Sequence, residues 1–454
     1  MHPASQPASP ASRLLGLHPG DRVALLLPGD LPSAGETGPT CGAVYVDLVL
    51  ALQQAGLVPV PLDPAMPAEE RRVRLEVTDP TLVVDDPADV PRLLVQARAL
   101  RRSELPLNRP MHCTSGTTGR PKGVWSGTLD EEAAAALVAE ERETWGFAAD
   151  DVNLVVSPLY HSAPLRFAVG TALAGGRVVV APKPHGGFDA AAVTATIAAH
   201  RPTSAFCVPT HLQRLFAHWD AQPEGAPDLT CFRLLAHAGA PCPPDIKRRL
   251  IEAFPAGTTW EFYGSTEGQF TACRSEDWLA RPGTVGKARP GRTLSVDADA
   301  VVWCSVPPHA RFSYFGDPDK TAEAWRQTDQ GPAFTVGDLG RLDDDGWLYL
   351  DARREDLVIS GGVNVYPAEV EAALRELDGV TDVAVFGRDD AAWGQRVCAA
   401  YVGEATAADL EAYAKGRLSA AQRPREWHRV EDLPRTPTGK VQRLQLPDHL
   451  GLSG

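Results

Sequence analysis

A loop of small and hydroxyl-bearing residues has the composition of a phosphate-binding segment. In Cys113-Thr-Ser-Gly-Thr-Thr-Gly-Arg-Pro-Lys-Gly123, three glycines allow the backbone to curl so that successive N–H groups point inward. Gly123 follows the lysine, whereas a Walker A loop requires Ser or Thr at that place. The sequence predicts a polyphosphate site, against the alternative of a polar surface loop. The residues expected to contact phosphate are Thr114, Ser115, Gly116, Thr117, Thr118 and Lys122.

Two carboxylates are suited to a nucleotide and its metal ion. Glu267 ends the block Tyr263-Gly-Ser-Thr-Glu267, and it is a hard oxygen ligand of the kind that Mg²⁺ prefers. Asp338 follows Gly337, and its two oxygens can accept hydrogen bonds from vicinal ribose hydroxyls. Each has a structural alternative, which is a helix-start acid for Glu267 and a turn residue for Asp338.

Two cations could add positive charge near a phosphate. Lys440 ends the segment Pro434-Arg-Thr-Pro-Thr-Gly-Lys440, whose prolines and glycine indicate a rigid, exposed turn. Arg353 begins the charged run Arg353-Arg-Glu-Asp356. The alternative for both is a solvated surface side chain.

Five blocks in a fixed order resemble the adenylate-forming superfamily, which includes acyl-CoA synthetases, stand-alone adenylation domains and beetle luciferases. The resemblance covers roughly Leu14 to Leu446, nearly the whole chain, with a shorter N-terminal lead than the family usually has. The blocks are the 113–123 loop, 263–267, Gly337-Asp338, the loop Gly361-Gly-Val-Asn-Val-Tyr-Pro-Ala-Glu369, and 434–440.

The resemblance implies a role for each residue of the 263–267 block. Tyr263 and Gly264 would lie against the adenine, Thr266 would contact the α-phosphate, and Glu267 would hold Mg²⁺. Asp338 would bind the ribose, with Arg353 near the ribose or phosphate.

The resemblance also implies a reaction in two steps. Lys440 would bridge the substrate carboxylate and the phosphate during adenylation. Rotation of a small C-terminal domain about Glu355 would then exchange Lys440 for Gly361 and Gly362, which would line a thiol tunnel. The family usually has Asp or Lys at the position of Glu355.

Three further segments resemble blocks of the family, and they add His161 as a candidate catalytic residue. Ser157-Pro-Leu-Tyr-His161 resembles the family's acid-pocket block. Two more segments, His237-Ala-Gly-Ala-Pro-Cys-Pro243 and Pro209-Thr-His211, look particularly like bacterial fatty-acyl-CoA synthetases. The first of them contributes Gly239, Ala240 and Pro241 as expected cofactor-binding residues. A structural histidine is the alternative for His161 and for His211.

The elements that position these residues alternate between short β-branched runs and amphipathic segments. Strands are predicted at 22–27, 57–62, 152–157, 177–181, 204–208 and 232–237, with helices at 44–55, 189–200 and 244–254 between them. This alternation predicts an α/β fold of parallel sheets flanked by helices. The resemblance adds a small β-barrel-like subdomain.

The pattern of predicted helices and strands changes near residue 350. A hairpin turn is predicted at Asp343-Asp-Asp-Gly346, a helix at 367–374 and strands at 380–387 and 396–402. We therefore expect an adenylation domain over 1–352 and a small, mobile α+β C-terminal lid domain over 353–454.

The composition of the chain excludes some classes of binding partner. A net charge of −14 argues against nucleic acid or an anionic membrane as the main partner. The eight cysteines include no Cys-x-x-Cys pair, and the apolar runs are too short to span a membrane. A cytoplasmic protein is expected, and a homodimer remains open.

The leading hypothesis is an AMP-forming acid–CoA ligase that uses ATP, Mg²⁺ and CoA. One alternative keeps the adenylating step but changes the acceptor to a carrier-protein thiol or an amine, or the acid to nitrite for diazotisation. A different class, a module that binds or hydrolyses ATP without ligation, would need no Lys440. A serine or cysteine hydrolase is disfavoured, because the Gly-x-Ser-x-Gly motif is absent.

Overall fold

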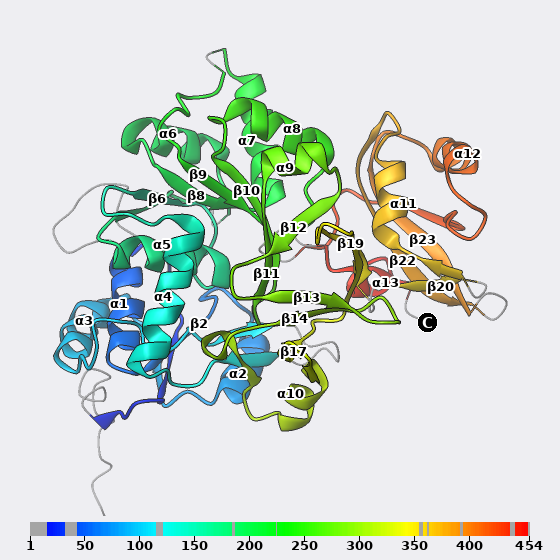
Figure 1. Cartoon of the computed structure of the whole chain (residues 1–454). Coiled ribbons are helices and arrows are strands. Elements are labelled where there is room, and N and C mark those ends of the chain that lie inside the picture. Colours follow the sequence, from blue (N-terminus) through cyan, green and yellow to red (C-terminus); the bar gives the residue numbers. More distant parts are fainter. Residues whose placement is uncertain are drawn as a thin grey trace, which may run out of the picture. The chain divides into compact units, whose positions relative to one another are not determined.

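The computed structural model describes residues 16–31, 43–114, 121–183, 187–223, 225–353, 357–360, 363–390, 394–435 and 441–452 (Figure 1). Two compact units share the chain. The first comprises Met1–Pro282, Gly286–Thr293 and Cys304–Phe334, and the second Gly283–Val285, Leu294–Trp303 and Thr335–Gly454. The domain boundary near residue 352 stays a prediction.

The first unit begins with a three-stranded parallel sheet of order β2-β1-β3. Its strands are β1 (Arg22–Leu25), β2 (Val58–Pro61) and β3 (Leu82–Val84), and α1 (Ala43–Gln54) packs on it through a shared apolar core. The two prolines of β2 lack an N–H and suit either an edge strand or a strand end, and the strand order places β2 at an edge.

The main sheet of the first unit has the order β12-β11-β10-β9-β8-β6-β7. The strands β6 (Val152–Val155), β7 (Arg177–Val180), β8 (Ser204–Cys207), β9 (Leu234–His237) and β10 (Thr259–Gly264) are parallel, and β11 (Gln269–Arg274) and β12 (Thr284–Ala288) are antiparallel. The predicted strand–helix alternation is confirmed.

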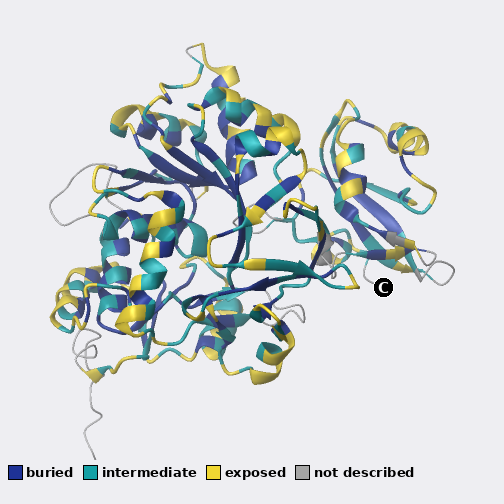
Figure 2. Cartoon of the chain, in the orientation of Figure 1, coloured by how far each residue is buried: buried dark blue, intermediate teal, exposed yellow. Residues whose placement is uncertain are grey.

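Helices cover both faces of this sheet because its strands are apolar on both sides. Leu154, Ala205 and Leu235 face α6 (Ala190–His200), α7 (Pro209–Ala221) and α8 (Pro244–Ala253) in one core cluster. Phe206 and Leu234 share another cluster with Trp145 of α4 (Glu131–Trp145) and Phe167 of α5 (Ser162–Leu173). The central strands are accordingly buried (Figure 2).

Two small antiparallel sheets complete the first unit, where a β-barrel-like subdomain was the expectation. One contains β15 (Ser313–Tyr314), β5 (Lys122–Trp125) and β4 (His112–Thr114) in that order. The other pairs the end of β14 (Val302–Ser305) with β17 (Gly331–Phe334), and β17 with β16 (Trp325–Thr328). The remaining helices of this unit are α2 (Ala68–Thr78), α3 (Val90–Ala99), α9 (Ser275–Ala280) and α10 (Pro318–Ala324).

The second unit is an α+β structure with its own apolar core. The predicted hairpin is present, since β18 (Asp338–Leu342) and β19 (Leu348–Arg353) flank a turn in which the Gly346 N–H donates to the Asp343 carbonyl at 2.9 Å. The predicted helix 367–374 is α11 (Pro367–Leu374). The other elements are β13 (Thr293–Val296), β20 (Val358–Ser360), β21 (Val363–Val365), β22 (Val380–Asp390), β23 (Gly394–Gly403), α12 (Ala407–Arg417), β24 (Glu426–Arg429) and α13 (Leu446–His449).

None of the helices within the described ranges is both long and apolar enough to cross a membrane.

Candidate nucleotide and metal site

The predicted phosphate loop joins β4 to β5, which form an antiparallel hairpin with Thr114 opposite Lys122. Its flanking residues are therefore held at one end of the small sheet. Ser115, Gly116, Thr117 and Thr118 lie outside the described residues.

Tyr314 links Lys122 to Glu267. The Lys122 ammonium lies 4.6 Å from the centre of the Tyr314 ring, and the Tyr314 hydroxyl donates to Oε1 of Glu267 at 3.0 Å. Tyr314 and Glu267 are both buried, with 8% and 6% of their surface exposed. Two predicted site residues, Lys122 and Glu267, thus contact the same tyrosine. The sequence analysis did not identify Tyr314.

Glu267 lies in the turn between β10 and β11, so the helix-start alternative is wrong. The Ser265 N–H donates to the Gly268 carbonyl at 2.8 Å, and a Cβ at Gly264 would lie 2.8 Å from that carbonyl oxygen. The strand register shifts between Tyr263 and Gly264. This tight turn carries Thr266 and Glu267, and glycine at 264 is required by the close backbone approach.

The ring of Tyr263 packs on Phe270 of β11, with ring centres 4.8 Å apart. Phe270 in turn packs on Phe334 at 4.8 Å, and a Cβ at Gly268 would lie 2.6 Å from the Phe334 ring. Aromatic packing therefore fixes both ends of the turn that bears Glu267.

Arg109 holds the main chain of the same turn. Its Nη1 donates to the Glu267 carbonyl at 3.4 Å, and its Nη2 donates to the Arg311 carbonyl at 2.9 Å. Burial, and next the nearby Arg292, lower the pKa of Arg109 to about 10, which leaves the guanidinium charged at neutral pH. Arg109 is a second residue that the sequence analysis missed.

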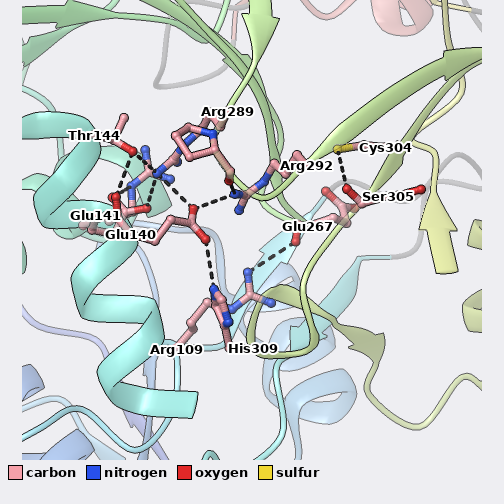
Figure 3. Close-up of polar contacts among 12 residues, drawn as sticks. Arg109, Glu140, Glu141, Thr144, Glu267, Arg289, Arg292, Cys304, Ser305 and His309 are labelled. Carbon is pink, nitrogen blue, oxygen red and sulfur yellow. Dashed lines mark hydrogen bonds and ion pairs between the residues drawn. The ribbon is translucent and has the colours of Figure 1, made fainter. Parts of the chain in front are cut away.

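A network of buried ion pairs lies beside Arg109 and ties α4 to the chain after β12 (Figure 3). Glu140 accepts from Arg292 at 2.6 Å and lies 3.0 Å from His309 Nε2 and 3.1 Å from Arg289. Glu141 pairs with Arg289 at 3.0 Å. Because α4 carries both glutamates, the network fixes this helix against the segment that contains Arg289 and Arg292.

Several predicted residues meet at the carboxyl edge of the main sheet. His161 follows β6, the segment Gly239, Ala240 and Pro241 follows β9, and Tyr263 is the second-last residue of β10. Since β6, β9 and β10 run parallel, their carboxyl ends share one edge, where open α/β sheets bind ligands. This placement supports a ligand site at that edge.

Two histidines at this edge are neutral at physiological pH. Burial, with smaller contributions from Arg74 and Lys183, lowers the pKa of His161 to about 4, and its Nε2 has no hydrogen-bond partner among the described residues. Burial likewise lowers the pKa of His211 to about 3, and its ring stacks on Phe188 with centres 4.3 Å apart. The packing of His211 agrees with its structural alternative.

His211→Phe is expected to make stability less sensitive to acid. The folded-state pKa of His211 lies below the unfolded value, so between pH 6.5 and about 3 the unfolded chain binds the extra proton. In that window wild-type stability falls with decreasing pH by up to about 1.4 kcal/mol per pH unit through this group. Urea unfolding from pH 7 to 4.5 should therefore give a shallower slope for the variant. An unchanged slope would contradict the assignment.

In the second unit, Asp338 begins β18 directly opposite Arg353 of β19. Asp338 is 6% exposed, and it follows Gly337, whose φ of +80° favours glycine. The side chain of Arg353 lies outside the description, as do Glu355, Gly361, Gly362 and Lys440. Their predicted roles stay predictions.

Comparison with known proteins gives matches along most of the chain. The AMP-binding enzyme family matches residues 111–302, and the AMP-binding enzyme C-terminal domain matches 369–440. A feruloyl-CoA synthase of Amycolatopsis sp is 31% identical over 97% of this chain and 91% of its own length.

Solved structures are also similar to this chain over most of its length. The ATP-bound MatB of Rhodopseudomonas palustris superposes with a TM-score of 0.76 at 28% identity, over 97% of this chain and 91% of that one. The o-succinylbenzoate CoA synthetase (MenE) of Bacillus subtilis, in complex with the acyl-adenylate intermediate OSB-AMP, has a TM-score of 0.76 at 25% identity, over 96% and 90% of the two chains.

Proposed function

Because the chain belongs to the AMP-binding enzyme family of the adenylate-forming superfamily, we propose that it is an AMP-forming acid–CoA ligase. It activates a carboxylic acid with ATP as an acyl-adenylate and then transfers the acyl group to CoA. The observation that carries the proposal is the whole-length similarity to a feruloyl-CoA synthase, at 31% identity over 91% of that protein. The placement of Lys122, Tyr314 and Glu267 on one small cluster supports the ATP-dependent step.

Glu267 fits a magnesium ion that is bound chiefly by nucleotide phosphates. Its carboxylate is buried, Oε1 accepts from Tyr314, and Oε2 has no hydrogen-bond partner among the described residues. Mg²⁺ in nucleotide sites needs only one or two protein carboxylates in addition to phosphate and water. Bound there, the ion would neutralise charge on the phosphate oxygens.

In the first step, a carboxylate oxygen of the acid attacks the α-phosphorus of ATP. The bond from that phosphorus to the β-phosphate oxygen breaks, and pyrophosphate leaves with the electron pair. Charge develops on the phosphate oxygens, so fixed donors that face them lower the barrier. We assign this task to the N–H groups and hydroxyls of the 114–118 loop, to Lys122 and Thr266, and to Lys440.

In the second step, the CoA thiolate attacks the acyl carbon and AMP leaves. The acyl-adenylate is a reactive mixed anhydride, so water must be kept from it. We assign Gly361 and Gly362 to the thiol channel. We assign Tyr263 and Gly264 to contact with the adenine of the nucleotide. Asp338 binds the ribose, with Arg353 near the ribose or phosphate.

The acid enters beside His161, and the segment Gly239, Ala240 and Pro241 binds the nucleotide, since these residues share the carboxyl edge of the sheet with Tyr263. His161 is neutral there, so it acts as a hydrogen-bond donor or acceptor rather than as a charge. We place the enzyme in the cytoplasm, because seven described cysteines are free thiols, which suits a reducing compartment. Its assembly as a homodimer stays a prediction.

Pyrophosphate release with a panel of acids, measured with and without CoA, tests the proposal. The expected result is acid-dependent release of pyrophosphate, followed by a CoA thioester that is identified by mass. Adenylation that CoA never discharges would replace CoA with a carrier thiol or an amine as acceptor. Release that requires nitrite and no carboxylic acid would point to diazotisation. ATP hydrolysis that no acid affects would contradict the ligase.

A further inference from the structure

We propose that Tyr314 is the positioning residue for the metal-binding carboxylate. Its hydroxyl holds Oε1 of Glu267 and so directs Oε2 to the metal ion of the ATP complex. The inference rests on the proposed function, because it takes Glu267 as the ligand of that ion.

The hydrogen bond fixes a side chain that would otherwise rotate. A carboxylate turns readily about its terminal bond, so its two oxygens exchange places unless a donor holds one of them. The Tyr314 hydroxyl donates to Oε1 at 3.0 Å, and both side chains are buried. A buried donor to an ionised acceptor is among the stronger hydrogen bonds in proteins. One oxygen of Glu267 is therefore left for a ligand.

Tyr314 is itself held on three sides. It pairs with Val124 across the small sheet, its N–H donates to Oγ1 of Thr321 at 2.9 Å, and its ring packs on Phe312 with centres 5.4 Å apart. Since β5 begins at Lys122, the same sheet carries Tyr314 and the cation that follows the phosphate loop. The tyrosine is thus a rigid part of the scaffold.

The ring also keeps two opposite charges apart. Lys122 lies over the ring face at 4.6 Å, whereas Glu267 is bound at the hydroxyl. Lys122 and Glu267 thus contact different parts of the same tyrosine side chain. A direct pair would satisfy each charge with the other. Because the tyrosine stands between them, the lysine stays available to phosphate and the glutamate to the metal.

Arg109 provides the second attachment. It binds the Glu267 carbonyl and the Arg311 carbonyl together, and Arg311 lies three residues before Tyr314. The turn that bears Glu267 and the strand that bears Tyr314 are therefore tied at the main chain as well as at the side chains. The distance between the hydroxyl and the carboxylate is then set by the scaffold rather than by the two side chains alone.

Tyr314→Phe tests the proposal, because it removes the hydroxyl and keeps the ring beneath Lys122. The probe is Mn²⁺, measured by electron paramagnetic resonance with α,β-methylene-ATP, which the first step cannot cleave. The variant is expected to bind Mn²⁺ about 5- to 30-fold more weakly in this ternary complex. In turnover, the Mg²⁺ concentration for half-maximal rate should rise by a similar factor, with the rate largely restored at saturating Mg²⁺.

Tyr45→Phe is the matched control. Tyr45 is buried in α1, and its hydroxyl has no hydrogen-bond partner among the described residues, so the variant should bind Mn²⁺ as the wild type does. Glu267→Gln completes a double-mutant cycle, in which Tyr314→Phe should cause no further loss.

Unchanged Mn²⁺ affinity in Tyr314→Phe would overturn the proposal. An equal loss in the Glu267→Gln background would overturn it too, since the hydroxyl would then act through the general fold. Neither measurement requires turnover, so both outcomes differ from failure of the proposed function, in which the wild type itself would release no pyrophosphate in response to acid.

Discussion

Lys440→Ala is expected to slow acyl-adenylate formation by about 100- to 1000-fold, because one donor to developing transition-state charge contributes about 2.7–4 kcal/mol. The affinity for ATP should change little, since the contact is expected in the transition state rather than in the ground state. Transfer of the acyl group to CoA from a supplied, synthetic acyl-adenylate should proceed within about three-fold of the wild-type rate, because the resemblance assigns Lys440 to the first step. Pyrophosphate release and thioester formation measure the two steps separately.

Lys415→Ala is the control for this experiment. Lys415 is an exposed lysine on α12 that pairs with Glu411 of the same helix at 2.8 Å, and its loss should leave both steps unchanged. Pyrophosphate release near the wild-type rate in Lys440→Ala would show that the lysine has no catalytic role. Equal losses in both steps would assign it to a different function.

The fold could be predicted where local chemistry and the global arrangement agree. Proline at the first turn marks the start of α11, and the observed helix Pro367–Leu374 coincides with the prediction. The prolines of β2 place that strand at an edge of its sheet. In both cases a missing N–H restricts the backbone in a way that depends on no distant residue.

Strand ends were predicted less well. Phe232 and Arg233 were assigned to a strand that begins at Leu234, because an apolar residue such as Phe232 packs equally well in the turn before it. The start and end of a short apolar run depend on which of its N–H groups find partners in the neighbouring strand. Those partners come from β8 and β10, far along the chain.

Some residues of the candidate site could be predicted from the sequence, and others could not. Lys122, Thr266 and Glu267 could be found because their motifs are contiguous. Tyr314 could not, because its partner Glu267 is 47 residues away and its surroundings, Phe312-Ser-Tyr-Phe315, are those of any core strand. Arg109 reaches the Glu267 carbonyl across 158 residues. Residues that act through one tertiary contact leave no periodic signal in the sequence.

Lys247 shows the same limit, and it leads to the largest expected effect on stability. It lies in α8, where the helical pattern gives no sign that a lysine is buried, yet its side chain is fully buried. Its ammonium contacts Oε2 of Glu261 on β10 and lies 4.9 Å from the centre of the Trp278 ring. In the folded protein the Lys247 ammonium has therefore lost its water shell, and it is stabilised by the contact with Glu261 and by the face of the Trp278 ring.

Lys247→Met is expected to lower the free energy of unfolding by about 3–5 kcal/mol. Methionine fills most of the volume, so the loss comes chiefly from leaving the Glu261 carboxylate buried without its cation. Urea unfolding at neutral pH measures the change. The surface variant Lys320→Met removes a lysine that pairs with Glu323 on the exposed side of α10, and it should leave the midpoint nearly unchanged.

The double variant Lys247→Met/Glu261→Met separates charge from packing. If an uncompensated carboxylate causes the loss, removing it should recover most of the stability, since a buried pair is often replaceable by apolar residues at little cost. If the double variant is as unstable as Lys247→Met, packing around Trp278 causes the loss instead. Glu261 lies two residues before Tyr263 on β10, so the double variant also tests whether the pair affects the nucleotide site. At urea concentrations well below the unfolding midpoint, its KM for ATP should equal that of the wild type. A raised KM would mean that this pair supports the nucleotide site as well as the fold.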